Sequence, residues 1–101
     1  MLSFLKTIFA TPNYKALLQH GAIIIDVRTP NEYDNGHIRN AKNIPLDKLN
    51  INITYLKKMN CTIICCCASG ARSGRAVAQL KANNITAING GNWQMLGKRI
   101  N

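Results

Sequence analysis

Two continuous apolar runs, each followed by a helix-start pattern, most constrain what this chain can fold into. The first run is residues 22–25, which closes on Asp26-Val27-Arg28, and the second is residues 62–66. Runs that are apolar on both faces are typical of buried parallel strands. After the first run, Thr29-Pro30-Asn31-Glu32 has the T-x-x-E spacing of a capping box with proline at the first helical position. After the second run, residues 73–83 carry apolar side chains at helical spacing.

The rest of the chain continues this alternation of strands and helices. Further helices are expected after an N-cap at Thr11 with Pro12, over residues 45–49 and 53–59, and after Asn92, and further short strands over residues 41–44 and 85–88, before a break at Gly90-Gly91. Strands that alternate with helices imply βαβ units and a parallel sheet. The predicted fold class is therefore α/β, with a small, mostly parallel central sheet and helices on both faces.

The length of 101 residues predicts one domain. We expect residues 1–12 to be an N-terminal extension and residues 13–101 to form the domain. The first ten residues lack a basic region before their apolar part, which Lys6 interrupts, so they make a poor secretory signal and are too short to span a bilayer. A short amphipathic helix is expected there, in a soluble, cytoplasmic protein that does not bind membranes.

The charge balance predicts an anionic substrate or an acidic partner. Thirteen lysines and arginines face four acidic residues, which gives a net charge of +9. The basic residues are scattered, with no run longer than Lys57-Lys58, and aromatic residues make up only 6% of the chain. Because stacking platforms for nucleic acid interleave aromatic and basic residues, we expect no nucleic-acid partner.

The four cysteines are Cys61, Cys65, Cys66 and Cys67. Three of them are consecutive, so they cannot link distant parts of the chain, and no paired CxxC or Cys/His spacing is present. We therefore expect no metal and no cofactor, and a reducing compartment. Core packing is the expected role of Cys65 and Cys66, which should point to opposite faces of their strand.

Cys67 lies where the second predicted strand gives way to a loop of small residues. Successive N–H groups in such a loop form an anion-binding concavity, and the helix that follows adds the positive end of its dipole. A thiolate at that point is stabilised, so we predict a lowered pKa and a nucleophilic Cys67. Open parallel sheets carry their sites at this end of the strands.

The segment Cys67-Ala-Ser-Gly70-Ala-Arg72-Ser73 resembles the active-site loop of the rhodanese (thiosulfate sulfurtransferase) family, CxxGxR followed by Ser or Thr. Four more stretches resemble that family in order: Asp26-Val27-Arg28, Glu32-Tyr33 with Gly36-His37-Ile38, Ala41 to Pro45, and Gly90-Gly91-Asn92-Trp93. The similarity covers roughly residues 13–98. It implies a single rhodanese-like domain.

The resemblance also implies a persulfide mechanism. The Cys67 thiolate would take the outer sulfur of a small anionic donor, such as thiosulfate, and pass it to cyanide or a thiol, including a possible protein acceptor. The loop residues would bind the substrate: Ala68, Ser69, Gly70, Ala71, Arg72 and Ser73. Arg72 would hold a sulfonate and Ser73 would donate its hydroxyl. We interpret Asp26 and Arg28 as a supporting polar network, together with Glu32. The alternative to core packing for Cys65 and Cys66 is that one of them attacks the persulfide on Cys67, forming a disulfide and releasing sulfide.

Two alternatives stay open from the residues. Counting from Cys66 to Arg72 gives the C-x5-R spacing of cysteine-dependent phosphatases, a class related in chemistry to arsenate reductases. Against that count, the glycine falls one place late and no histidine precedes the cysteine. The other alternative is a non-enzymatic rhodanese-like module that carries or senses persulfide for a partner.

Overall fold

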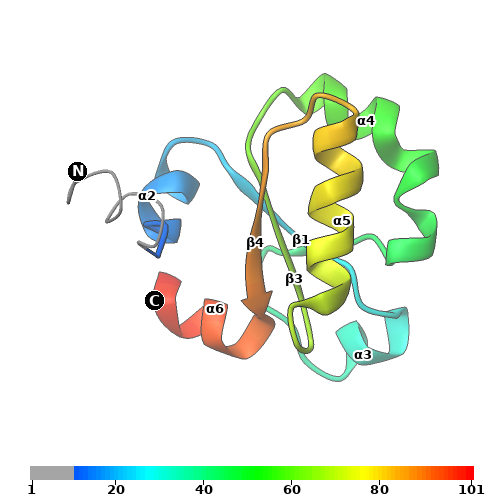
Figure 1. Ribbon diagram of the computed structural model, residues 1–101. Helices are drawn as coiled ribbons and strands as arrows, with labels where there is room; N and C mark the ends of the chain where they lie inside the picture. The colour runs from blue at the N-terminus through cyan, green and yellow to red at the C-terminus, as the bar shows by residue number, and fades with distance from the viewer. Residues whose placement is uncertain (1–10) are drawn as a thin grey trace.

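The computed structural model describes residues 11–101, so the helix expected within residues 1–10 lies outside the part described. Strands and helices alternate along the chain (Figure 1). In order they are α2 (Tyr14–Gln19), β1 (Ile23–Asp26), α3 (Pro30–Asp34), β2 (Lys42–Asn43), the 3-10 helices η1 (Leu46–Lys48) and η2 (Asn50–Asn52), α4 (Ile53–Met59), β3 (Ile63–Cys67), α5 (Ala71–Ala82), β4 (Ala87–Asn92) and α6 (Trp93–Ile100). None of these helices combines the length and apolar character needed to cross a bilayer.

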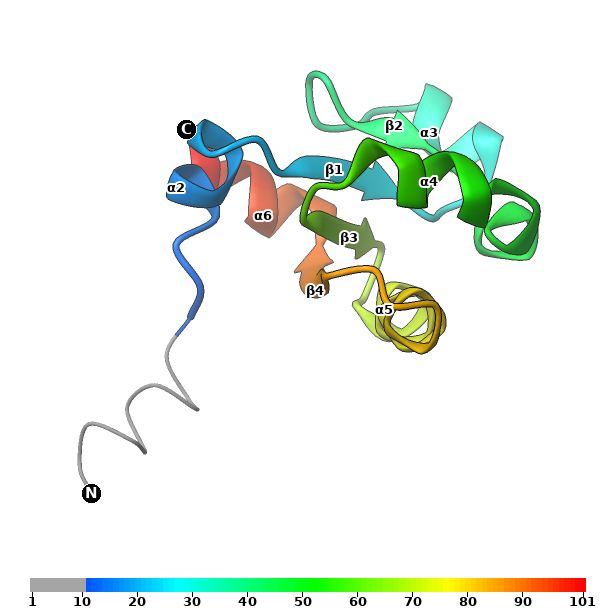
Figure 2. The ribbon, with the colours of Figure 1, turned by 90° about the horizontal axis from the view of Figure 1, so that it is seen from above.

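The four strands form one sheet in the order β2-β1-β3-β4, and every neighbouring pair is parallel. Helices α4 and α5 cover one face, while α2 and α6 cover the other (Figures 1 and 2). The core is correspondingly split into two clusters, one on each side of the sheet. The predicted α/β class, with helices on both faces of a parallel sheet, is confirmed.

Strand β3 contributes to both clusters, which explains why its sequence is continuously apolar. Ile63, Cys65 and Cys67 pack on the α5 side, whereas Ile64 and Cys66 pack on the α2 and α6 side. All five residues have 0% relative exposure. Because both faces are buried, a polar side chain at any of these positions would need a buried hydrogen-bond partner. The strand runs one residue further than predicted, so Cys67 is its last residue rather than the first residue of the loop.

The predicted capping box is confirmed at the start of α3. Thr29 Oγ1 accepts a hydrogen bond from the Glu32 N–H at 3.3 Å, and Glu32 Oε1 accepts one from the Thr29 N–H at 3.0 Å. The prediction for α2 was wrong by two residues. Asn13, not Thr11, caps that helix, because the Asn13 side chain accepts the Ala16 N–H at 3.0 Å.

The course of β4 differs most from the sequence-based expectation. A strand over residues 85–88 and a break at Gly90-Gly91 were expected, yet β4 spans Ala87–Asn92 and includes both glycines. A Cβ at Gly90 would lie only 2.8 Å from Leu96 Cδ2 and 2.9 Å from Ile64 Cγ2. Glycine is therefore required here for close approach of the strand to its neighbours. Pairing with β3 shifts register at this point, because Cys65 pairs with Asn89 and Cys66 with Gly91, and it then continues to Asn92. Asn92 caps α6 as predicted.

Candidate active site

Cys67 ends β3, and only residues 68–70 separate it from α5. Gly70 caps the N-terminus of α5 with φ of +97°, a left-handed conformation that glycine adopts without steric cost. This sharp turn wraps the loop around the Cys67 sulfur and starts α5 close to it. The strand–loop–helix sequence thus brings Gly70 and Ser73, two of the predicted loop residues, to one atom.

Two N–H groups donate to Cys67 Sγ, and a hydroxyl oxygen lies within hydrogen-bonding distance of it. The Gly70 N–H lies at 3.0 Å, the Ser73 N–H at 3.3 Å and the Ser73 hydroxyl oxygen at 3.3 Å. Not every amide of the loop turns inward, since the Ala71 N–H donates to Ser69 Oγ at 3.4 Å. The expected cradle of N–H groups therefore exists, and it is built mainly from Gly70 and Ser73.

These contacts change the acidity of Cys67. Burial opposes ionisation, but hydrogen bonds from the Ser73 hydroxyl and N–H and from the Gly70 and Ser69 backbone outweigh it, so the pKa of Cys67 lies below that of an ordinary thiol. Its two neighbours behave in the opposite way. Burial raises the pKa of Cys65 to about 12 and also raises the pKa of Cys66. Of the three consecutive cysteines, Cys67 is the one whose thiolate is stabilised.

The loop covers Cys67 in this conformation. The residue has 0% relative exposure, whereas Ala68, Ser69 and Ala71 above it are exposed. The sulfur therefore lies beneath a polar ring and not in a wholly apolar seal. A reagent or substrate reaches Sγ only when the loop moves.

Arg72 pairs with Glu32 on α3. Its two terminal nitrogens donate to the two carboxylate oxygens at 2.7 and 2.9 Å, a bidentate geometry. The Arg72 guanidinium and the Thr29 N–H lower the pKa of Glu32 to about 2. An anion that binds Arg72 thus competes with the Glu32 carboxylate.

Asp26 and Arg28, interpreted from the sequence as a supporting polar network, form a buried network beside the loop. Arg28 Nε and Nη2 donate to the Asp26 carboxylate at 2.9 and 2.7 Å. The guanidinium also donates to the carbonyls of Gly36, at 2.7 Å, and Glu32, at 3.2 Å. The guanidinium also lies 4.5 Å from the Trp93 ring centroid. Glu32 joins this network through its carbonyl, while its carboxylate belongs to Arg72.

Two asparagines of β4 complete the site, and sequence reasoning missed this role for both. Asn92 Nδ2 donates to the Ala68 carbonyl at 2.6 Å, and Asn89 Nδ2 donates to the Gly70 carbonyl at 3.0 Å. Asn89 Oδ1 accepts the Ser73 hydroxyl at 2.7 Å. These bonds hold loop carbonyls outward, which leaves N–H groups free to face the sulfur. The available signal was their place beside the glycine-rich turn, at the carboxyl end of the strand next to β3.

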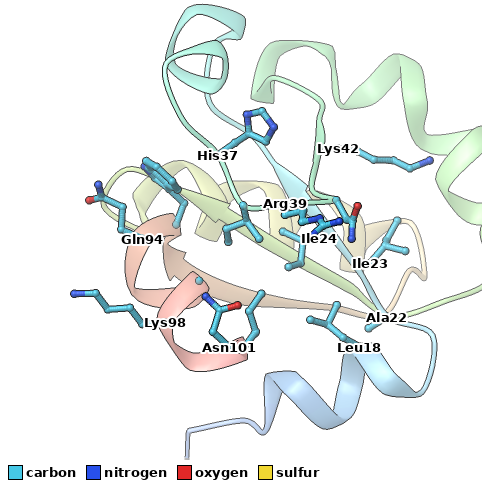
Figure 3. A pocket seen from close by; sticks show the side chains of 15 residues that line it. Leu18, Ala22, Ile23, Ile24, His37, Arg39, Lys42, Gln94, Lys98 and Asn101 are labelled. Carbon is cyan, nitrogen blue, oxygen red and sulfur yellow. The ribbon is translucent and has the colours of Figure 1, made fainter.

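A separate cavity of about 930 Å³ lies on the α2 and α6 side of the sheet (Figure 3). Its apolar lining includes Leu18, Ile24 and Trp93, with Arg39 and Lys98 among its polar residues. It contains no residue of the Cys67 loop. Within residues 11–101, no three His, Cys, Asp or Glu side chains are grouped so that they could hold a metal ion.

Comparison with known proteins places this geometry in a family. The family model of the rhodanese-like domain matches residues 11–95. The uncharacterized protein YqhL of Bacillus subtilis (strain 168) is 40% identical over 67 residues, which cover 66% of this chain and 52% of that protein. The chain thus spans about half the length of this relative.

Two solved structures share the fold. A rhodanese-like domain protein from Staphylococcus aureus is 34% identical with a TM-score of 0.68, covering 91% of this chain and 80% of that one. A rhodanese with anions from E. coli is 32% identical with a TM-score of 0.67, covering 73% of this chain and 89% of that one. The family match, the parallel sheet and the cysteine loop agree, and the chain belongs to the rhodanese-like domain family, which includes sulfurtransferases.

Proposed function

We propose that this protein is a sulfurtransferase that moves a sulfane sulfur from thiosulfate, or from a persulfide donor, to cyanide or a thiol through a persulfide on Cys67. One observation carries the proposal: the Gly70 N–H, the Ser73 N–H and the Ser73 hydroxyl converge on a single sulfur atom. The two N–H donors, and the hydroxyl when its proton turns to the sulfur, stabilise negative charge there.

In the first half-reaction the Cys67 thiolate attacks the outer sulfur of the donor. A new S–S bond forms, the donor's bond to that sulfur breaks, and sulfite departs with the electron pair when the donor is thiosulfate. A thiolate needs no separate general base, which fits a site whose hydrogen-bonding partners are backbone N–H groups and a serine. The terminal sulfur then carries the negative charge and is solvated by the loop once the loop has moved to admit it.

In the second half-reaction cyanide or a thiolate attacks the terminal sulfur. The S–S bond to Cys67 breaks, and the Cys67 sulfur leaves as a thiolate. Because a thiol with a lower pKa is a better leaving group, the groups that lower the pKa of Cys67 favour this step as well as the first. The same groups around Cys67 Sγ therefore favour both half-reactions.

The charges around the site support an anionic donor. The net charge of +9 attracts anions, and the bidentate Arg72 guanidinium lies at the start of α5. The solved E. coli rhodanese that this chain resembles is described with anions. We expect the donor to displace the Glu32 carboxylate from Arg72 at least in part.

The structure gives no support to the phosphatase count from Cys66. That residue has 0% exposure, packs in the cluster on the α2 and α6 side, and has a raised pKa. A persulfide carrier without turnover is the second candidate. The complete burial of Cys67 favours it, because the covering loop would shield a persulfide from small acceptors such as cyanide. It shares the Cys67 persulfide but not the release step.

Two measurements separate these functions. Intact mass and peptide mapping after thiosulfate exposure should show one added sulfur on Cys67, present in the matched control Cys61→Ser and absent from Cys67→Ser. Thiocyanate formation from thiosulfate and cyanide should then show turnover in the wild type. Persulfide without turnover would support the carrier, and absence of any added sulfur on Cys67 would contradict both functions.

A further inference from the structure

The Asn89 side chain makes three polar contacts, and two of them fix the orientation of its amide. The Gly91 N–H points at Oδ1 from 2.9 Å, and Nδ2 points at the Gly70 carbonyl from 3.0 Å. A backbone N–H can only donate and a carbonyl can only accept, so exchanging Oδ1 and Nδ2 would break both bonds. The atom that faces Ser73 is therefore the oxygen.

This orientation decides where the Ser73 hydroxyl proton lies. Ser73 Oγ is 2.7 Å from Asn89 Oδ1, an atom that only accepts, so the single Ser73 proton lies between them. Toward Cys67 Sγ, at 3.3 Å, the serine then offers a lone pair, which suits a protonated thiol. A thiolate or persulfide anion has no proton to give. It gains the serine as a donor only if that hydroxyl rotates away from Asn89.

We propose that Asn89 is a positioning residue that competes with Cys67 for the Ser73 hydroxyl proton. Asn89 holds the proton while Cys67 is a thiol, and the proton turns to sulfur when the sulfur becomes anionic. The proposal deepens the function proposed above, because it assigns the group that controls the charge-stabilising hydroxyl. Gly74 leaves room for the amide, since a Cβ there would lie 3.3 Å from Asn89 Nδ2.

The Asn89 side chain has a second effect that must be separated from the first. Its bond to the Gly70 carbonyl also holds the loop, so truncation loosens the N–H groups that face the sulfur. Other titratable groups lie in the elements packed around the site: Cys65 and Cys66 on β3, Arg72 and Arg75 on α5, Glu32 on α3, and Asp26 with Arg28 at the end of β1. None of these residues is substituted in the variants described below, so each group is present in every variant that is compared.

The experiment is a double-mutant cycle read out as the Cys67 pKa. Alkylation by iodoacetamide is followed against pH, with Cys67 labelling quantified by peptide mapping, in wild type, Asn89→Ala, Ser73→Ala and the double variant. If Asn89 acts through Ser73, the Asn89→Ala shift is more negative by about 0.5 to 1 pKa unit when Ser73 is present than when residue 73 is alanine. The loosened loop contributes to both backgrounds and cancels.

Equal shifts in the two backgrounds, or a more positive shift with Ser73 present, would overturn the proposal. Asn89 is exposed, so its truncation leaves the core intact, and Asn89→Val gives a second cycle with a residue suited to strands. Asn52→Ala is the matched control, because Asn52 Nδ2 also donates to a carbonyl, that of Lys48, at 2.9 Å. It should leave the Cys67 pKa unchanged. Since no donor is used, absent turnover would not affect the result, and a missing coupling would leave sulfur transfer standing.

Discussion

The two arginine–carboxylate pairs beside the loop have similar contact distances but different surroundings. Arg28 and Asp26 approach to 2.7 Å with side chains that are 5% and 0% exposed, whereas Arg72 and Glu32 approach to the same distance with side chains that are 34% and 36% exposed. The inner pair joins residues two positions apart, and the outer pair joins residues forty positions apart. The more buried pair therefore joins residues that are close in the sequence, and the more exposed pair joins residues that are far apart.

This difference in burial suggests different roles for the two pairs: one holds the chain in place, and the other can exchange its partner. The inner pair has its remaining donors satisfied by the carbonyls of Glu32 and Gly36, so it fixes the chain from β1 through α3 and has no solvent to replace a lost partner. The outer pair joins α3 to α5 at the rim of the loop, where water or an anion can take the place of either partner. We infer that the first maintains the site and the second regulates access to Arg72.

Breaking the inner pair should have the largest effect. Arg28→Met leaves the Asp26 carboxylate buried without its partner and should lower the free energy of unfolding by about 3–5 kcal/mol. Urea denaturation measures this loss. Arg99→Met, at an exposed position, is the matched control and should stay within about 0.5 kcal/mol of wild type. If Arg28→Met lowers the free energy of unfolding no more than Arg99→Met does, the inner pair does not stabilise the fold as proposed.

Breaking the outer pair should instead improve donor binding. Glu32→Gln keeps the capping-box geometry but removes the charge that competes for Arg72, so the KM for thiosulfate should fall about fivefold, the equivalent of an exposed pair worth about 1 kcal/mol. Steady-state thiocyanate formation measures it. Asp34→Asn neutralises an exposed acid on the same helix and should change KM little. An unchanged or higher KM in Glu32→Gln would show that Glu32 does not compete.

Acid should affect the outer pair in a defined window. The pKa of Glu32 is about 2 in the folded chain against an ordinary 4.5, so its stabilising contribution is present above pH 4.5 and is lost as the pH falls toward 2. Because the pair is partly exposed, the contribution is at most about 1 kcal/mol. Urea unfolding of wild type and Glu32→Gln from pH 6 to pH 2 should converge at the acid end. A gap that stays constant would contradict the assignment.

Salt gives the smallest effect and compares the pairs directly. Raising ionic strength from about 0.05 to 0.5 M should reduce the stability difference between wild type and Glu32→Gln by a few tenths of a kcal/mol, because the outer pair is exposed to counterions. The Arg28→Met difference should hardly change, because its pair is buried. The two differences measured in the same salt series by urea denaturation test this, and equal salt dependence would argue against the contrast.

Much of the fold could be predicted because local patterns carry it. The apolar runs in β1 and β3 follow from burial on both faces, and the Thr29–Glu32 capping box needs only neighbours in the chain. The path of β4 could not be predicted in this way. Gly90 reads as an interruption, but its absent side chain makes room for Leu96 and Ile64, and those contacts exist only in the folded molecule.

The candidate site also has a part that could be predicted from the sequence and a part that could not. The Cys67 loop has a recognisable spacing, and its N–H groups converge because a short turn meets a helix. The partners of that loop have no spacing to recognise. Glu32 lies forty positions from Arg72, and Asn89 lies sixteen from Ser73, so their contacts depend on how α3 and β4 are placed by the sheet. Polar side chains at such distances carry no periodic signal in a single sequence.

The brevity of the turn between β3 and α5 has a practical consequence for engineering. Three residues, 68–70, connect a strand that is buried throughout to a helix that packs on the same sheet, and those three contribute nothing to either hydrophobic cluster. Lengthening or exchanging these residues would change the loop that covers the sulfur, while both hydrophobic clusters that stabilise the fold stay unchanged. Variants with a different substrate specificity can thus be sought by replacing residues 68–70 while β3 and α5 are left unchanged.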